Sequence, residues 1–486
     1  MRAIDKNVKL TRKELFKLAM VFFVNTLVLI GVMCVFLLAN CGGMKHFLDY
    51  VQAESARVSF VFFSVFVMAV VTYLYLLNQN KEIAKKPKNA TMIFGVITLS
   101  LIVSYLFGGI SVYLRPVALC AILVLILVDK RTAVFINCVY AIIMLLTDIL
   151  CVSFDGNGNY VLISLILCFA VGMFSVFLID GEGSRGKVLV MGLLISLPVT
   201  IAACLVEFNA EVNKMLMPAL YGLASGLLAT GLMTITLPIF EVTYGALTNF
   251  RLTELTDHKS KLIKELSLSA PGTFSHTIIV AMLAEACGNA IGENPLLVRA
   301  CAYYHDMGKL KNPEMFTENQ TGKNPHDALS PELSTDIIRS HAKDGADLIR
   351  KRRLPEAFAA AAEQHHGTMP ITYFYMKASK FTDGKLALEN FSYYGPKPQN
   401  KITAIIMICD ACEAKVRTIN NRTHENVDKA VKEIIEERMD FDQFYECDIT
   451  MKDLDIIRKT LTNSLAGVHH DRVEYPKLKI GGNKYE

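Results

Sequence analysis

The chain has 486 residues, of which 52% are hydrophobic, and its formal net charge is only +4. So small a charge, without a basic stripe interleaved with aromatic residues, gives no electrostatic basis for binding a nucleic acid polymer, and we expect no such partner. The 12 cysteines follow no regular spacing, which excludes a disulfide scaffold and indicates small buried hydrophobic residues in a reducing compartment. The Cys-X-X-Cys pair Cys409–Cys412 lacks the second pair that would complete a zinc site.

The first half of the chain is predicted to be a membrane domain, residues 1–240, because apolar residues are concentrated there while charged residues crowd the second half. A helix needs about 20 apolar residues to cross a bilayer. Eight segments approach or exceed this length: 18–38, 58–77, 92–110, 113–128, 133–152, 161–179, 188–206 and 217–239. The fourth segment is short, and Arg115–Pro116 near its beginning leaves its first residue undefined. The first is longer than the apolar core of a signal peptide, so we expect an uncleaved anchor followed by seven further spans.

The connections between these spans predict their orientation. Lys and Arg are frequent in the N-terminal tail and the even-numbered loops and scarce in the odd-numbered loops. Cytoplasmic loops carry an excess of these residues, so we expect both termini on the cytoplasmic side of the lipid bilayer. Asp148 interrupts the fifth span. An intramembrane carboxylate indicates function by default, but one near a helix end can also snorkel to the surface, so it gives a transporter only weak support.

A mixed apolar and charged stretch, residues 241–270, follows Pro238 and is predicted to be a linker helix that leaves the membrane. It is compatible with a passive tether and with a lever that carries a signal. From Pro271 onward the apolar spacing is helical, and strands are hardly indicated. The expected fold is all-α: a polytopic helical membrane domain (1–240), a linker helix (241–270) and a cytosolic all-helical domain (271–486).

Histidines and aspartates recur along the helices predicted in the last domain. Five histidines and two aspartates are candidate metal ligands: His276, His305, Asp306, His341, His365, His366 and Asp410. This mixture suits divalent Mn, Fe, Zn or Co, whereas magnesium alone would use more oxygen ligands. Asp410 is the most informative, because a carboxylate flanked by Ile408 and Cys409 would be strongly disfavoured by desolvation unless a cation or strong donors met it.

The order of these residues resembles the HD phosphohydrolase superfamily. His276, the pair His305–Asp306 and then Asp410 match its H…HD…D signature. The stretches PGTFSHT, AYYHDMGKLKNPEMFTENQ, NPHDALSPELS, SHAKDGADL, QHHGT and GPKPQNK narrow the likeness to the seven-transmembrane HD family of PgpH-type cyclic di-AMP phosphodiesterases, and it extends to ECDITMKDL and HHDRVEYP. Members of that family usually carry a large extracytoplasmic domain after the first span. The short connection at residues 41–58 cannot contain such a domain.

The resemblance implies two divalent metal ions, Mn or Fe, as cofactors. By position, the ligands of the first ion would be His276, His305, Asp306 and Asp410, and those of the second would be His341 and His365, with Asp306 bridging the two. The implied catalytic residues are Asp306, Lys309 and His366. His366 would touch a metal or the phosphate, Lys309 would neutralise a phosphate oxygen, and Gly308 would let the backbone turn. Water activated between the two ions would attack phosphorus in line.

The resemblance implies a phosphodiesterase of the bacterial cell membrane that hydrolyses the second messenger cyclic di-AMP to linear pApA. Cyclic di-GMP is disfavoured as the substrate, because HHGTMPITYFYMKA lacks the GYP triplet of that subfamily. An HD-type hydrolase of another nucleotide and a receptor whose HD domain only binds nucleotide stay open, as does a homodimer. Four tyrosines are explained equally well as adenine-stacking or as core residues: Tyr303, Tyr304, Tyr373 and Tyr375.

Overall fold

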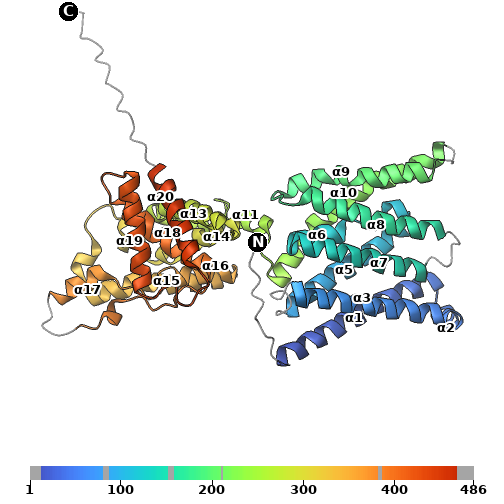
Figure 1. Ribbon diagram of the computed structural model, residues 1–486, viewed down its shortest axis with the longest axis horizontal. Helices are drawn as coiled ribbons and strands as arrows, with labels where there is room; N and C mark the ends of the chain where they lie inside the picture. Colours follow the sequence, from blue (N-terminus) through green and yellow to red (C-terminus); the bar gives the residue numbers. More distant parts are fainter. Residues whose placement is uncertain (1–11, 80–86, 152–157, 209–211, 381–385, 468–486) are drawn as a thin grey trace, which may run out of the picture. The chain divides into compact units, whose positions relative to one another are not determined.

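The chain folds into two helical units (Figure 1). The computed structural model describes residues 12–79, 87–151, 158–208, 212–380 and 386–467. Contacts separate a membrane unit, which ends at Arg251, from a second unit that begins at Leu252. Across these ranges the chain forms helices and no strand, apart from an isolated bridge between Pro370 and Ser392. The all-α prediction is therefore confirmed. The stretch HHDRVEYP (469–476) and most of the basic N-terminal tail lie outside the described residues.

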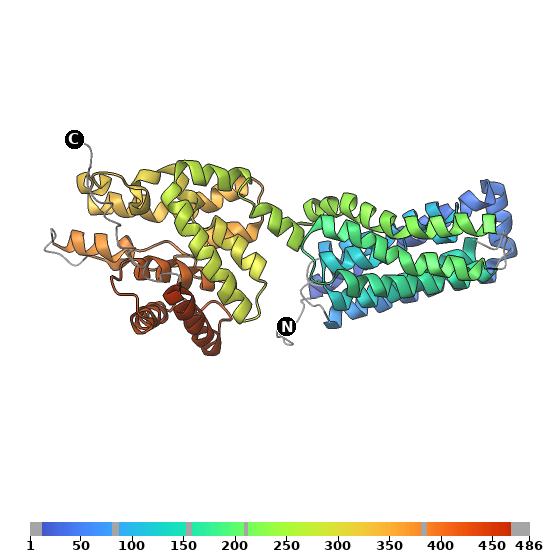
Figure 2. The same ribbon diagram turned by 90° about the horizontal axis from the view of Figure 1, so that it is seen from above.

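The membrane unit is a bundle of apolar helices that run side by side (Figures 1 and 2). Seven of them are long and apolar enough to cross a membrane, and large apolar side chains such as Phe63, Phe177 and Leu205 stay exposed on their outer faces. A lipid bilayer covers such a surface, so this is a membrane protein. The helices are α1 (Arg12–Cys41), α2 (Met44–Ala53), α3 (Ser55–Gln79), α5 (Pro87–Gly108), α6 (Leu119–Leu127), α7 (Lys130–Cys151), α8 (Gly158–Ile179), α9 (Arg185–Val206) and α10 (Val212–Tyr244).

The fourth predicted span, residues 113–128, is built differently from the others. The 3₁₀ turn η1 (Val112–Leu114) and α6 together form a shorter apolar stretch, Val112–Leu127. Leu119 and the five residues after it are buried, and α6 packs against α7, α8 and α10. The stretch is a central segment enclosed by other helices, and it is shorter than a typical bilayer-crossing helix. The seven other predicted spans coincide with the seven long helices.

Asp148 does not snorkel to a membrane surface. Its side chain on α7 is buried, and its two carboxylate oxygens accept hydrogen bonds from the Arg115 guanidinium at 2.7 and 2.8 Å. A bidentate arginine partner offsets much of the cost of burying a carboxylate. The snorkelling explanation of this residue is therefore wrong, because its partner lies inside the bundle.

The second unit contains the remaining helices. They are α12 (Lys261–Ser269), α13 (Pro271–Ala290), α14 (Pro295–Tyr304), α15 (Pro331–Lys351), α16 (Glu356–Gln364), α17 (Thr372–Ser379), α18 (Lys401–Arg417), α19 (His424–Asp440) and α20 (Met451–Gly467), with short 3₁₀ turns that include η3 (Met307–Lys311), η5 (Thr317–Asn319) and η7 (Leu388–Phe391). Side chains of Asn294, Ser330 and Asn400 cap α14, α15 and α18 by accepting hydrogen bonds from the first free backbone amides. The sequence thus fixes where three of the site-bearing helices begin.

The predicted linker, residues 241–270, is not one helix. The chain leaves α10 at Gly245, whose φ of 69° is a conformation that glycine adopts at helix ends, and then forms α11 (Asn249–Leu255) and α12. Leu262, Ile263 and Leu266 of α12 are buried, and α12 packs on α13. This burial makes α12 part of the second unit, so the division of contacts lies inside α11 and not at the predicted boundaries of 240 and 270.

Candidate metal centre

Five helices bring all seven candidate ligands together. The ligands lie on α13 (His276), at the end of α14 (His305 and Asp306), on α15 (His341), at the end of α16 (His365 and His366) and on α18 (Asp410). Their ligand atoms form three groups in which all atoms lie within 4.8 Å of one another: His276, His305 and Asp410; His305, Asp306 and His365; and His341, His365 and His366. Because His305 and His365 are each shared between two groups, the three form one continuous site.

The Asp306 carboxylate lies at the middle of this site and faces both sides. Its Oδ2 is 3.3 Å from His305 Nε2 and 3.8 Å from His276 Nε2. Its Oδ1 is 3.4 Å from His341 Nε2 and 3.6 Å from His365 Nε2. Each oxygen therefore points at a different pair of imidazoles, which is the arrangement that a carboxylate bridging two cations requires.

Three of the histidines are oriented in the same way by their own helices. The Nδ1–H of His305 donates to the Ala302 carbonyl at 2.6 Å, that of His341 to Ile338 at 2.5 Å and that of His365 to Ala362 at 2.8 Å. Each acceptor lies three residues earlier in the chain. A backbone carbonyl can only accept, so Nδ1 carries the proton and Nε2 presents a lone pair to the site. Backbone carbonyls commonly hold metal-ligating histidines in this tautomer.

Several lone pairs at the centre of the site lack donors. His305 Nε2 and Asp306 Oδ1 are buried without a hydrogen-bond partner, Asp306 Oδ2 faces the Lys309 ammonium at 2.8 Å, and the Nε2 atoms of His341 and His365 face each other at 3.3 Å. Buried acceptors without donors are strongly disfavoured. A cation among them would satisfy these atoms together, and imidazole nitrogen with carboxylate oxygen is the donor set of divalent transition metals. The residues present therefore fit the implied metal.

The electrostatics agree with a site built for positive charge. Burial opposes ionisation of Asp306, but the neighbouring Lys309 ammonium outweighs it and holds the pKa of this carboxyl well below its usual range. Burial lowers the pKa of His276, yet hydrogen bonds to Asp410 and Glu413 raise it to about 9. Burial lowers the pKa of His341 to about 4. The carboxylates are thus ionised, and His276 balances them with a proton that a metal cation would replace.

Lys309 is held between two carboxylates. Its Nζ lies 2.8 Å from Asp306 Oδ2 and 2.8 Å from Glu318 Oε1, and only 12% of its side chain is exposed. The sequence predicts that this ammonium meets a phosphate oxygen. In this structure it closes the site beside the Asp306 carboxylate, and Glu318 on η5 is the residue that positions it.

The prediction that Gly308 is needed to let the backbone turn is wrong. Its φ is not in the positive range, so the backbone does not need glycine in order to turn there. A Cβ at this position would lie 1.9 Å from the His341 carbonyl oxygen and 2.7 Å from the Gly345 nitrogen. Glycine is needed because the backbone of α15 passes directly against η3.

Sequence reasoning missed two residues that contact the ligands. Glu413 Oε2 accepts a hydrogen bond from His276 Nδ1 at 2.5 Å. It follows Asp410 by three positions on α18, so helical spacing was an available signal for a second carboxylate on the same face. The half-buried Tyr393 ring stacks on His366 with ring centroids 4.2 Å apart. Tyr393 lies between η7 and α18, where periodicity carries no signal.

The four tyrosines considered for adenine stacking differ in their burial. Tyr304 is fully buried, stacks on Phe358 and donates a hydrogen bond to the Leu255 carbonyl at 2.8 Å, and Tyr303 is buried beside it. These two are core residues. On α17, Tyr373 is exposed and Tyr375 packs against a small apolar cluster around Phe391.

Comparisons with known proteins agree with this division of the chain. The family described as "7TM receptor with intracellular HD hydrolase" matches residues 55–248, and the HD domain family matches residues 273–415. The second range contains all seven candidate ligands. The two matched ranges together cover most of the membrane unit and the whole candidate metal centre.

Two curated relatives are named cyclic-di-AMP phosphodiesterase PgpH. The protein from Bacillus subtilis (strain 168) is 38% identical over 427 residues, which are 84% of this chain and 58% of the relative. The protein from Listeria monocytogenes is 34% identical over 448 residues, 90% of this chain and 61% of the relative. The chain thus spans about three fifths of the length of these relatives. A crystal structure of the L. monocytogenes PgpH HD domain in complex with cyclic-di-AMP is 45% identical and covers 43% of this chain and 98% of that one, with a TM-score of 0.42.

Proposed function

Because the chain belongs to the family of 7TM receptors with an intracellular HD hydrolase, we propose that it is a membrane phosphodiesterase that opens cyclic di-AMP to linear pApA. One observation carries this proposal: seven buried or half-buried His and Asp residues, with Asp306 among them, form one continuous site. The relatives named cyclic-di-AMP phosphodiesterase support the choice of substrate. The HD domain, and both chain termini, would face the cytoplasm.

HD domains bind divalent metals, and we assign two ions, Mn or Fe, to this site. The ligands of the first would be His276, His305, Asp306 and Asp410, and those of the second Asp306, His341 and His365. When bound, such ions supply the Lewis acidity that makes water nucleophilic near neutral pH and offsets charge on phosphoryl oxygens.

The protein's own residues orient the site and meet the substrate. Glu413 holds the His276 ring by its Nδ1 and so directs Nε2 inward. His366 is the most exposed of the site histidines, with 23% of its side chain accessible, and Tyr393 fixes the plane of its ring. His366 therefore contacts the phosphate at the open side of the site. Lys309 adds positive charge next to Asp306, where it stabilises charge that develops on a phosphoryl oxygen.

The test is hydrolysis by the purified full chain in detergent with manganese. We expect cyclic di-AMP to be cut faster than cyclic di-GMP and AMP, with pApA as the first product by chromatography. Preferential turnover of cyclic di-GMP or of mononucleotides would contradict the assigned substrate. Tight binding of cyclic di-AMP by a metal-loaded chain without turnover would instead identify a receptor.

A further inference from the structure

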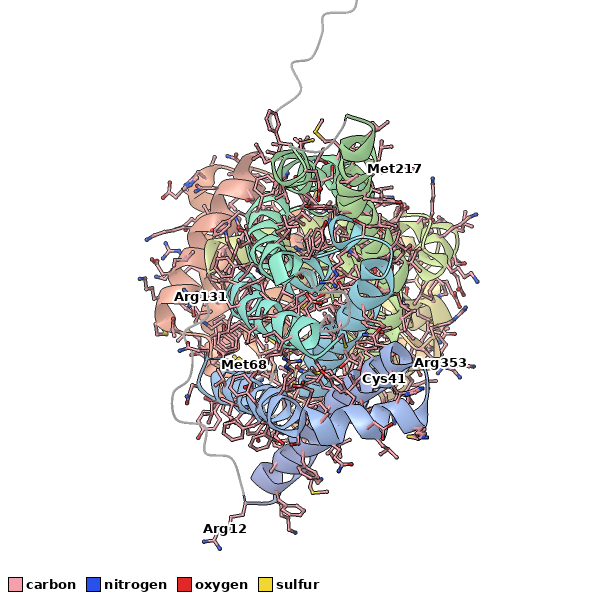
Figure 3. The ribbon with its side chains drawn as sticks, turned by 90° about the vertical axis from the view of Figure 1, so that its right-hand side faces the viewer. Arg12, Cys41, Met68, Arg131, Met217 and Arg353 are labelled. Carbon is pink, nitrogen blue, oxygen red and sulfur yellow. The ribbon has the colours of Figure 1, made fainter. Side chains whose placement is uncertain are left out.

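A second polar site lies inside the membrane unit. A cavity of about 440 Å³ is lined by residues at the ends of α5, α7 and α9, the starts of α8 and α10, and η1. Figure 3 looks along the bundle from this end, where Met217 lies near the start of α10 and next to the lining residue Pro218. The volume is within the range of small-molecule pockets. None of its lining residues belongs to the candidate metal centre.

One pair of charges in the cavity wall is already balanced. The Arg115 guanidinium donates to both oxygens of Asp148, at 2.7 and 2.8 Å, and to the Ser164 hydroxyl at 2.6 Å. The backbone carbonyl of Arg115 accepts a hydrogen bond from the Ser225 hydroxyl at 2.5 Å. These bonds join η1 to α7, α8 and α10. An anionic ligand would have to displace Asp148 from a buried bidentate pair, which is strongly unfavourable.

A third charged residue in the wall, Glu207, has no counterion among the described residues. Glu207, just after α9, accepts a hydrogen bond from the buried Tyr113 hydroxyl at 3.1 Å, and Tyr160 lines the same cavity. Among the residues that the structure describes, no Lys, Arg or His lies within ion-pair distance of Glu207. The formal charges of Arg115, Asp148 and Glu207 leave the cavity with one net negative charge.

The geometry points to a binding site for a small organic cation, a protonated amine with an apolar or aromatic body. The Glu207 carboxylate supplies the counterion, and the faces of Tyr113 and Tyr160 attract a cation. Apolar wall residues such as Val112 and Val161 accommodate the body of such a ligand. This inference rests on the membrane unit alone and does not depend on the proposed hydrolase activity. With the termini in the cytoplasm, this end of the bundle faces the outside.

The test uses three probes of similar size and different charge: 2-phenylethylamine, the neutral 2-phenylethanol and the anion 3-phenylpropionate. Calorimetric titration into the full chain in lipid nanodiscs, with empty nanodiscs subtracted, measures each affinity. We expect the amine to bind at least about tenfold more tightly than the other two. Equal affinity for the alcohol, or a preference for the anion, would overturn the inference.

A variant and its matched control locate the amine. Glu207→Gln keeps the size and the hydrogen-bond acceptor and removes the charge, so it should weaken amine binding about tenfold and leave 2-phenylethanol unchanged. Glu54→Gln makes the same change outside the cavity, at a residue whose side chain is 42% exposed and pairs with Arg57 at 3.6 Å, and this variant should bind the amine as the unaltered chain does. Unchanged amine binding in Glu207→Gln, with its helical circular dichroism intact, would refute the site. If that variant does not fold, the preference of the unaltered chain for the amine over the alcohol decides.

Discussion

Asp306 contributes its two carboxylate oxygens to opposite sides of the candidate metal centre. Oδ2 faces His276 and His305, while Oδ1 faces His341 and His365. A single buried side chain thus joins two sets of imidazoles. At the scale of the residue, the proposed chemistry depends on this carboxylate and on the few groups that orient its neighbours.

Asp306→Ala should abolish hydrolysis of cyclic di-AMP, because the two ions lose the ligand that they share. The metal content of the purified chain, measured by mass spectrometry, should fall at the same time. Circular dichroism should keep its helical form, since Asp306 is not part of the apolar core. Two retained metals with near-normal turnover would show that the dinuclear assignment is wrong.

Lys309→Ala should lower turnover on the order of 10²-fold while both ions stay bound, because it removes positive charge near the phosphate and no ligand. Steady-state kinetics and metal analysis of the same sample measure both effects. Lys311→Ala is the control, since the exposed Lys311 pairs with Asp344 at 3.0 Å and should have no effect. A loss of metal as large as that of Asp306→Ala would identify Lys309 as a structural member of the site.

Glu413→Ala should weaken metal affinity by about 10–100-fold, the usual effect of removing a group that orients a ligand. Excess manganese should restore most of the turnover, because Glu413 touches His276 and not the substrate. Glu433→Ala, at an exposed carboxylate on α19, provides the control. A defect that saturating metal does not rescue would argue against this orienting role.

At the scale of the elements, the site depends on the close passage of η3 and α15. Gly308 and Gly345 face each other there, and a Cβ on either would approach the backbone of the other element. This contact sets the position of His341 on α15 relative to Asp306, which immediately precedes η3. Two glycines that are far apart in the sequence therefore position ligands on both sides of the site.

Gly308→Ala should destabilise the second unit by about 1–3 kcal/mol, as is typical of overpacking, and should also weaken metal binding, because α15 must move away from η3. Thermal unfolding with and without manganese measures both effects. Gly322→Ala is the matched control, since a Cβ at Gly322 meets nothing within 4 Å. Equal melting temperatures for the two variants would contradict the proposed packing constraint.

At the scale of the whole molecule, the number of times the chain crosses the membrane determines whether its two termini lie on the same side of the membrane. The residues at the C-terminal ends of α5 and α7 line the same cavity, so η1 and α6 must carry the chain back across the bundle between them. This course agrees with eight crossings, although only seven helices have the full length. An even number of crossings keeps both termini on one side.

A reporter fused at Asn157, a position outside the described residues, should therefore report the outside of the cell. A fusion at Gly183, between α8 and α9, should report the cytoplasm, because one span separates the two positions. Alkaline phosphatase and green fluorescent protein fusions measure the two sides. A cytoplasmic signal at Asn157 would eliminate the eight-span topology.

The sequence by itself determined the helical class, the membrane half and the identity of the seven candidate ligands. These properties depend on apolar spacing and on residues whose order in the chain is distinctive. Only the tertiary structure decided the other features. These are the need for glycine at position 308, the Asp148–Arg115 pair, the contacts of Glu413 and Glu318, and the stacking of Tyr393 on His366. Except for the Lys309–Glu318 contact, each of them joins segments that are distant in sequence. Such contacts form when helices pack together, and local periodicity does not say which residues will meet.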